Sequence, residues 1–148
     1  MTIDGVWHNE LGSSLTLTSH PDGSLTGIYE TRVGEAAGRF TVAGRFNVGS
    51  VGGSLGTAVG WTVAWTNDVT SSHSVTSWSG QYFAGEPERI DVTWLLVIES
   101  TPGEMWESTL VGQDVFTREA PADHTVRGKL DSGMRSAHPL RQVKPRGH

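Results

Sequence analysis

Apolar and polar residues alternate along most of the first 120 positions, in short runs that end at turn-forming residues. A period of two places successive side chains on opposite faces of a β-strand. Eight such runs are present, at 6–10, 14–19, 24–30, 39–46, 55–66, 74–82, 89–98 and 107–117. Gly, Pro, Asn and Asp lie between them, as in Pro21-Asp22-Gly23, which favours antiparallel hairpins. No window in this region keeps a helical period, so the pattern predicts an all-β domain.

Eight strands joined mostly by short connections are compatible with a sandwich or with a barrel. Closure into a barrel removes the exposed strand edges that a sandwich leaves. We therefore predict an all-β fold, an eight-stranded antiparallel up-and-down β-barrel. The interior of such a barrel is just wide enough to be filled by side chains or to hold one small ligand.

The faces predicted to point inward mix aromatic and polar side chains. One run places Trp61, Val63 and Trp65 on the same face. Other runs place polar residues among apolar ones on a shared face, namely Asn9, Ser13, Tyr29, Thr31, Ser74, Thr76 and Asp114. A buried polar group without a partner costs about 1–3 kcal/mol. Such faces therefore suit a pocket whose ligand supplies donors and acceptors.

Each of these residues also has a purely structural explanation. Ser, Thr and Tyr on an antiparallel sheet commonly face solvent. Asp114 could be a surface carboxylate paired with an arginine. Trp7 and Trp61 are better explained as packing residues than as a ligand wall. The sequence alone leaves these alternatives open.

Composition narrows the classes of function. The chain has 11 Lys and Arg against 16 Asp and Glu and a net charge of −5, which argues against nucleic acid as a partner. Cysteine is absent, so disulfides and thiolate nucleophiles are excluded. His8, His20 and His73 lack the spacing of metal ligands, and no metal site is predicted. No nucleophile stands beside a base in a known catalytic motif, so we predict that the protein is not an enzyme.

Charge and aromatic content divide the chain near residue 120. Residues 121–148 carry six Lys and Arg, two acidic residues and no Trp, Tyr or Phe. We predict a β-barrel domain over residues 1–120 and a basic, flexible C-terminal tail over 121–148. No apolar run approaches the roughly 20 residues that span a bilayer, so we expect no membrane association. The first residues are too polar for a signal peptide.

Four ordered blocks resemble the avidin/streptavidin family. They are Gly5–Ser13, Gly56–Trp65, Thr76–Tyr82 and Trp106–Asp114. The resemblance extends without gaps from about residue 5 to 117. It implies an eight-stranded barrel that binds biotin with high affinity, sequesters it without catalysis and needs no cofactor. It also implies a secreted homotetramer, whose signal peptide would not be part of this sequence.

The resemblance further assigns residues to parts of biotin. Asn9, Ser13 and Tyr29 would donate to the ureido oxygen. Asp114 and Thr31 would accept from the two ureido N–H groups. The remaining positions would line the thioether, ring, valeryl chain and carboxylate of biotin, and they are Thr76, Trp65, Trp78, Trp94, Leu11, Val33, Ser74 and, through its backbone N–H, Glu35. Trp106 matches a residue that closes the pocket of a neighbouring subunit.

Some features stay open within this resemblance. Glu35 stands where the streptavidin branch of the family has Asn, and its charge would repel the biotin carboxylate and speed release modestly. Some bacterial members place their own C-terminal segment in a biotin pocket, and the tail here is a candidate for the same contact. A lipocalin-like carrier of another small apolar ligand is the alternative function, and it predicts a mostly apolar cavity. A hydrolase acting on an activated ester is a third hypothesis.

Overall fold

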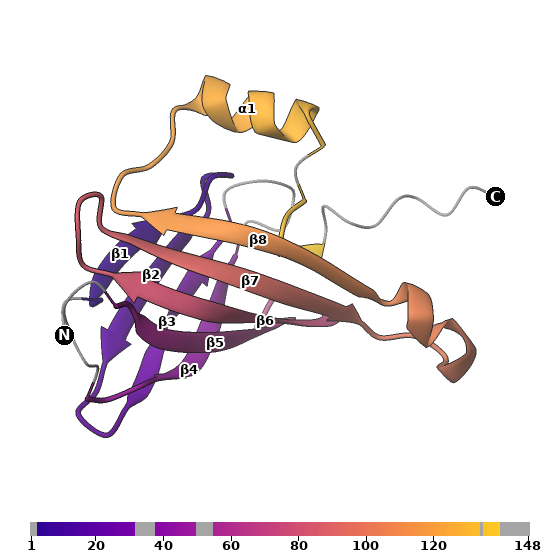
Figure 1. Cartoon of the computed structure of the whole chain (residues 1–148). Helices are drawn as coiled ribbons and strands as arrows, with labels where there is room; N and C mark the ends of the chain where they lie inside the picture. Colours follow the sequence, from indigo (N-terminus) through magenta and orange to yellow (C-terminus); the bar gives the residue numbers. More distant parts are fainter. Residues whose placement is uncertain (1–2, 32–37, 50–54, 134, 140–148) are drawn as a thin grey trace.

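Eight antiparallel strands close into one barrel, each hydrogen-bonded to the next in chain order and β8 to β1 (Figure 1). The structure is a computed structural model that describes residues 3–31, 38–49, 55–133 and 135–139. The strands are β1 (Gly5–His8), β2 (Ser14–Ser19), β3 (Ser24–Glu30), β4 (Arg39–Phe46), β5 (Thr57–Thr66), β6 (Ser71–Phe83), β7 (Arg89–Ile98) and β8 (Thr109–Thr117). The predicted up-and-down barrel is confirmed.

The first strand ends two residues earlier than its alternating pattern predicts. The side-chain Oδ1 of Asn9 accepts hydrogen bonds from the backbone N–H groups of Leu11 and Ser13, at 3.1 and 3.0 Å. Such local side-chain bonds offer the backbone an alternative to the strand ladder. Gly12 has a φ of 83° within the same turn, a conformation that favours glycine. A turn, and not a strand, therefore carries the buried side chains of Asn9, Leu11 and Ser13.

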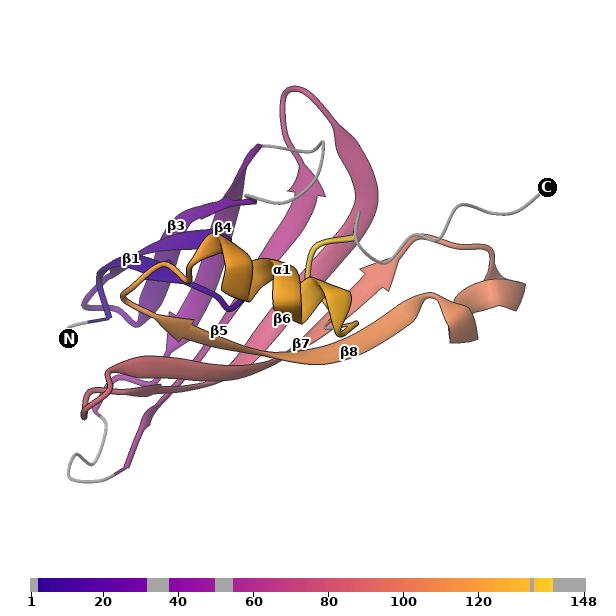
Figure 2. The ribbon, with the colours of Figure 1, turned by 90° about the horizontal axis from the view of Figure 1, so that it is seen from above.

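The last strand begins later than predicted, because the residues before it form a 3₁₀ helix. This helix, η1 (Pro102–Glu107), starts with a proline in its first turn and contains Trp106. Figures 1 and 2 show η1 at the tip of the β7–β8 hairpin, extending beyond the barrel wall. The side chain of Trp106 is thus carried away from the interior of its own barrel.

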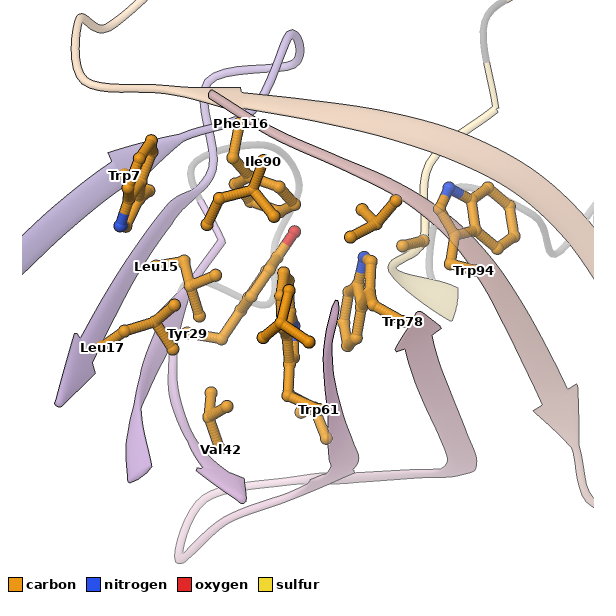
Figure 3. Close-up of a cluster of buried hydrophobic side chains, with 14 of the residues drawn as sticks. Trp7, Leu15, Leu17, Tyr29, Val42, Trp61, Trp78, Ile90, Trp94 and Phe116 are labelled. Atoms are coloured by element: carbon orange, nitrogen blue, oxygen red, sulfur yellow. The ribbon is translucent and has the colours of Figure 1, made fainter. Parts of the chain in front are cut away.

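Large apolar side chains fill the barrel interior, including those of Trp7, Leu15, Leu17, Val42, Trp61, Ile90 and Phe116 (Figure 3). Trp7 donates its indole N–H to the carbonyl of Ile3 at 2.8 Å, and Trp61 packs edge-on against Phe116 with ring centroids 5.6 Å apart. Both tryptophans behave as packing residues, in agreement with the interpretation of the sequence.

The closure of the barrel between β1 and β8 is narrow. Only His8 and Thr117 pair across it in the described register. Arg118 follows directly and reinforces this junction. Its guanidinium lies 3.7 Å above the ring of Trp7, and it donates to the Asp4 carbonyl at 3.1 Å and to Glu88 at 3.0 Å.

Composition predicted a flexible tail over residues 121–148, and the described part of this range includes the helix α1 (Asp123–Asp131). It lies outside the barrel above β8 (Figure 1), and Lys129 on it reaches Glu10 at 3.6 Å. After α1 the chain returns to the barrel, where residues 136–139 are buried. Among the described residues, no helix combines the length and apolarity needed to cross a bilayer.

Candidate functional site

One end of the barrel carries most of the predicted site residues. In an up-and-down barrel every second connection lies at the same end. The turn at residues 9–13, the end of β3 and the connections 67–70 and 99–108 therefore share one end. The predicted residues come from this turn, from β3 and from the inward faces of β5 to β8.

Three polar side chains, two from the turn at residues 9–13 and one from β3, meet inside this end. Asn9 Nδ2 donates to the hydroxyl of Tyr29 at 3.4 Å, and the polar side chain of Ser13 favours the ionised form of the same phenol. All three residues are buried. Burial raises the pKa of Tyr29, and the nearby charge of Asp114 raises it further. The phenol therefore stays protonated and can donate a hydrogen bond at any physiological pH.

Asp114 is the only buried carboxylate among the residues described. Its side chain lies in the interior with 1% of its surface exposed, and Trp78 donates its indole N–H to Oδ2 at 3.0 Å. Burial raises its pKa to about 6; the Trp78 hydrogen bond opposes this, and the charge of Glu10 adds to it. The alternative of a surface carboxylate paired with arginine is wrong. The second oxygen, Oδ1, has no hydrogen-bond partner among the described residues.

Indole rings surround this polar cluster. Trp65 and Trp78 lie edge to face at 6.2 Å, and Tyr29 packs on them at 5.3 and 5.5 Å. Trp78 pairs with Trp94 across β6 and β7. Trp94 in turn covers Gly112 so closely that a Cβ there would lie 2.1 Å from Cζ2 of the indole. The absence of a side chain at position 112 thus leaves the space that the indole of Trp94 occupies.

The remaining predicted residues are mostly buried beside the same group. Thr76 accepts a hydrogen bond from Trp65 Nε1 at 2.8 Å. Ser74, Thr31 and Leu11 are also buried, and Ser74 Oγ has no hydrogen-bond partner in the described part of the chain. A solvated face is therefore the wrong explanation for Tyr29, Thr31, Ser74 and Thr76. Val33 and Glu35 lie outside the described residues.

The C-terminal segment Ser136–Pro139 lies against this group. Thr76 donates its hydroxyl to the carbonyl of Ala137 at 2.6 Å. The ring of His138 packs edge-on against Trp65 at 4.5 Å and lies 6.1 Å from Phe40. The backbone N–H of His138 donates to Ser136 Oγ at 3.1 Å, which holds the segment in a turn. The chain's own C-terminal segment thus occupies part of the interior.

Sequence reasoning did not assign Phe40 or His138 to the site. Phe40 shares the inward face of its alternating run with Val42, so the period of two could have placed it. The segment around His138 has no such pattern. Only the resemblance to the family pointed to a contact between the tail and the pocket.

A surface cleft of about 570 Å³ lies apart from this cluster. Its lining includes Asp4, His20, Phe46 and Asn47, from the end of the barrel opposite the turn at residues 9–13. None of these residues was predicted to bind a ligand. The buried group of polar and indole side chains is therefore the candidate site.

The sequence also matches the family model described as the Avidin family, over residues 1–119. The chain belongs to the avidin family. Membership suggests biotin binding by a non-enzymatic protein, which agrees with a buried site of hydrogen-bonding groups. Helix α1 and the segment Ser136–Pro139 lie beyond the matched region.

Trp106, the residue expected to cover a neighbouring subunit's pocket in avidin-family assemblies, does not contribute to the interior of its own barrel. It lies on η1 with 78% of its surface exposed, next to Met105, which is 67% exposed. Within a single chain this indole has little apolar contact.

Proposed function

We propose that this protein binds biotin with high affinity and sequesters it without chemical turnover. The observation that carries the proposal is the buried carboxylate of Asp114, which lies among indoles and hydroxyl donors. Its Oδ1 has no hydrogen-bond partner among the described residues. A buried acceptor of this kind is costly unless a ligand supplies the donor. Membership of the avidin family points to the ureido ring of biotin as that donor.

The ureido group has one acceptor oxygen and two N–H donors, and the polar residues fit this chemistry. Asn9, Ser13 and the protonated Tyr29 would donate to the oxygen. Convergent donors of this kind stabilise negative charge on an oxygen, as in an oxyanion hole. Asp114 and Thr31 would accept from the N–H groups. The bond to Asp114 is charge-assisted and therefore the strongest of the set.

Apolar and weakly polar groups would hold the rest of biotin. Trp65, Trp78 and Trp94 would enclose the bicyclic ring and the valeryl chain, with Leu11 and Val33 beside them. Thr76 would lie near the thioether sulfur. Ser74 and the backbone N–H of Glu35 would receive the carboxylate, and the charge of the Glu35 side chain would make release modestly faster.

We further propose that the protein is a homotetramer in which Trp106 closes the pocket of a neighbouring subunit. Exposed apolar side chains support an interface on the outer face of β6 to β8. They lie next to one another in the register, with Val75 opposite Val97 and Leu95 opposite Val111. Burial of such a stripe, together with Trp106 and Met105, would stabilise an assembly.

The proposed setting is extracellular, and the proposed partners are biotin and further copies of the chain, without nucleic acid or membrane. An apolar carrier of the lipocalin kind would have no need of the buried Asp114, Asn9 and Tyr29, so the site favours biotin over that alternative.

Retention on immobilised biotin tests the proposal. The protein should bind biotin-agarose and elute with free biotin, whereas Asp114→Ala should be retained far less. Asp68→Ala, in the exposed β5–β6 turn, is the matched control and should behave as the unmodified chain. Equal retention of Asp114→Ala would contradict the proposed chemistry, and capture of apolar dyes in place of biotin would favour the carrier.

A further inference from the structure

Helix α1 reaches the turn that carries two of the polar residues of the candidate site. The helix lies outside the barrel above β8 (Figure 1), beyond the region that the family model matches. Lys129 stands in its last turn, and its Nζ lies 3.6 Å from Oε2 of Glu10. Glu10 directly follows Asn9, whose Oδ1 accepts two backbone hydrogen bonds within the same turn. An element outside the barrel thus places a positive charge beside the turn of the site.

Glu10 also lies beside the part of β8 that carries Asp114. Where the barrel closes, His8 on β1 pairs with Thr117 on β8. The two segments are antiparallel, so the chain continues from His8 to Glu10 alongside the residues that precede Thr117. In agreement with this register, Glu10 and Val115 line the same cavity of about 390 Å³. Val115 is the chain neighbour of Asp114, which brings the carboxylate of Glu10 close to the buried one.

The charges around this cavity are unequal. Among the described residues that line it, Glu10 and Glu119 are acidic and Lys129 is basic. The side chain of Glu10 is 26% exposed and that of Lys129 is 42% exposed, so solvent screens their charges only in part. Burial raises the pKa of Asp114, the Trp78 hydrogen bond opposes this, and the charge of Glu10 adds to it. An ammonium group next to Glu10 offsets that like-charge effect.

The other titratable group that faces Asp114 carries no charge. It is Tyr29 on β3, and burial raises the pKa of its phenol far above neutral pH. The carboxylate of Glu10 is therefore the group through which α1 can act on Asp114.

We propose that Lys129 is a positioning residue of the candidate site, which offsets the charge of Glu10 and thereby keeps Asp114 ionised and ready to accept a hydrogen bond from the ligand. Helix α1 then raises affinity without contacting the ligand. Because the ion pair is partly exposed, its effect is modest and falls as the salt concentration rises. The effect on affinity rests on the proposed function, whereas the effect on Asp114 exists in the ligand-free protein.

Carboxyl ¹³C NMR of the full-length, ligand-free protein with labelled aspartate follows the charge of Asp114 directly, and Asp114→Asn identifies its signal. We expect Lys129→Gln to raise the midpoint of the Asp114 titration by about 0.2–0.6 pH unit, as loss of a partly exposed charge partner does. Lys129→Glu should raise it further. Arg127→Gln removes an equal charge from an exposed position of the same helix and should leave the midpoint unchanged.

A double-mutant cycle shows whether Lys129 acts through Glu10. Glu10→Gln should lower the Asp114 midpoint, and in this background Lys129→Gln should produce less than half of its original shift. The inference is overturned if Lys129→Gln and Arg127→Gln give the same midpoint, or if the shift is as large without Glu10 as with it.

A conservative variant separates the charge of Lys129 from its packing. Lys129→Arg keeps the positive charge, and it should therefore restore the midpoint of the unmodified protein. If Lys129→Arg shifts the midpoint as Lys129→Gln does, the role of Lys129 is structural and the inference is overturned.

Biotin affinity at two pH values then tests the consequence for binding. At pH 6 we expect Lys129→Gln to bind biotin about twofold more weakly than the unmodified protein, because a smaller fraction of molecules carries ionised Asp114. At pH 8 the affinities should be equal, since Asp114 is ionised in both. Equal affinities at pH 6, or a loss of the same size at both pH values, overturn the inference. Absence of biotin binding to the unmodified protein would instead refute the proposed function, and the NMR titration would still decide the role of Lys129.

Discussion

Trp78 on β6 and Asp114 on β8 are joined by a hydrogen bond of 3.0 Å that spans the intervening strand β7. The bond satisfies one carboxylate oxygen and leaves the other directed at the interior without a partner among the described residues. Burial nevertheless dominates, since the pKa of Asp114 rises to about 6. Burial thus destabilises the charged form of this carboxyl group as long as no donor binds to Oδ1.

This destabilisation should be visible in the ligand-free protein. The native state binds more protons than the unfolded state between pH 4 and 6, because the pKa of Asp114 is 3.8 unperturbed and about 6 in the fold. The free energy of unfolding should therefore fall as the pH rises through this window, by up to about 3 kcal/mol. Asp114→Asn should reduce this dependence. Urea denaturation from pH 4 to 7 measures it, and identical pH profiles would contradict the assignment.

Biotin affinity should show the opposite dependence on pH. In the proposed complex the charged form of Asp114 would accept a ureido N–H, and protonation below about pH 6 would remove the charge that strengthens this bond. Affinity should therefore decline as the pH falls through 6, by up to about tenfold per pH unit. Titration calorimetry or dissociation rates across this range provide the measurement. The Asp114→Asn variant should bind more weakly and lack the decline.

Replacement of Trp106 should affect retention and assembly together. We expect Trp106→Lys to release biotin faster and to weaken the proposed tetramer, because it introduces a charge where the exposed indole would cover a neighbouring pocket. Val69→Lys, at a position that is 91% exposed on the β5–β6 turn, is the control. Competition with excess biotin gives the release rate, and size-exclusion chromatography gives the assembly. An unchanged release rate would exclude the shared lid.

Gly112 should be intolerant of any side chain. A Cβ at this position would lie 2.1 Å from Cζ2 of Trp94, so Gly112→Ala must move the indole or the strand. We expect a loss of stability of about 1–3 kcal/mol from overpacking and weaker biotin binding. Gly85→Ala is the control, because nothing lies within 4 Å of the added atom. Similar melting temperatures for both variants would show that Trp94 is not held as described.

Arg118 should matter for closure of the barrel more than an ordinary surface arginine does. Arg118→Ala removes the guanidinium from the ring of Trp7 and its hydrogen bond to Glu88, and we expect a loss of about 1–3 kcal/mol. The Arg118 hydrogen bond also lowers the pKa of Glu88, so this contribution should disappear as the pH falls through the acid range. Thermal denaturation of Arg118→Ala against Arg127→Ala, an exposed position on α1, tests this expectation.

Most of the barrel could be predicted from the alternation of residues, because each strand buries one face. The period places Trp61, Trp78 and Asp114 on the faces predicted to point inward, but it left a surface position open for Asp114 until the structure showed its burial. The ends of β1 and β8 could not be predicted, since the Asn9 side chain and the 3₁₀ helix η1 replace ladder hydrogen bonds with local ones. Helix α1 was missed because Val126 and Leu130 are its only apolar residues, too few to show a helical period.

Only part of the candidate site could be predicted from the sequence. Period-two counting brought Thr76 and Trp78 to one face, but it gave no reason to place Asn9 beside Tyr29, which depends on how the first turn folds. The contacts of His138 with Trp65 join residues more than 70 positions apart, and no local pattern records them. The resemblance to the family supplied the ligand, which the side chains alone left open.

The family match ends at residue 119, yet the side chains that cover Trp65 include one from residue 138. The part of the chain that the family model matches is therefore smaller than the part that encloses the cluster. A chain shortened to residues 1–119 would lose the ring of His138 from Trp65 and the carbonyl of Ala137 from Thr76. The open end of such a barrel would be wider than that of the whole chain, so the two proteins should be compared and not interchanged.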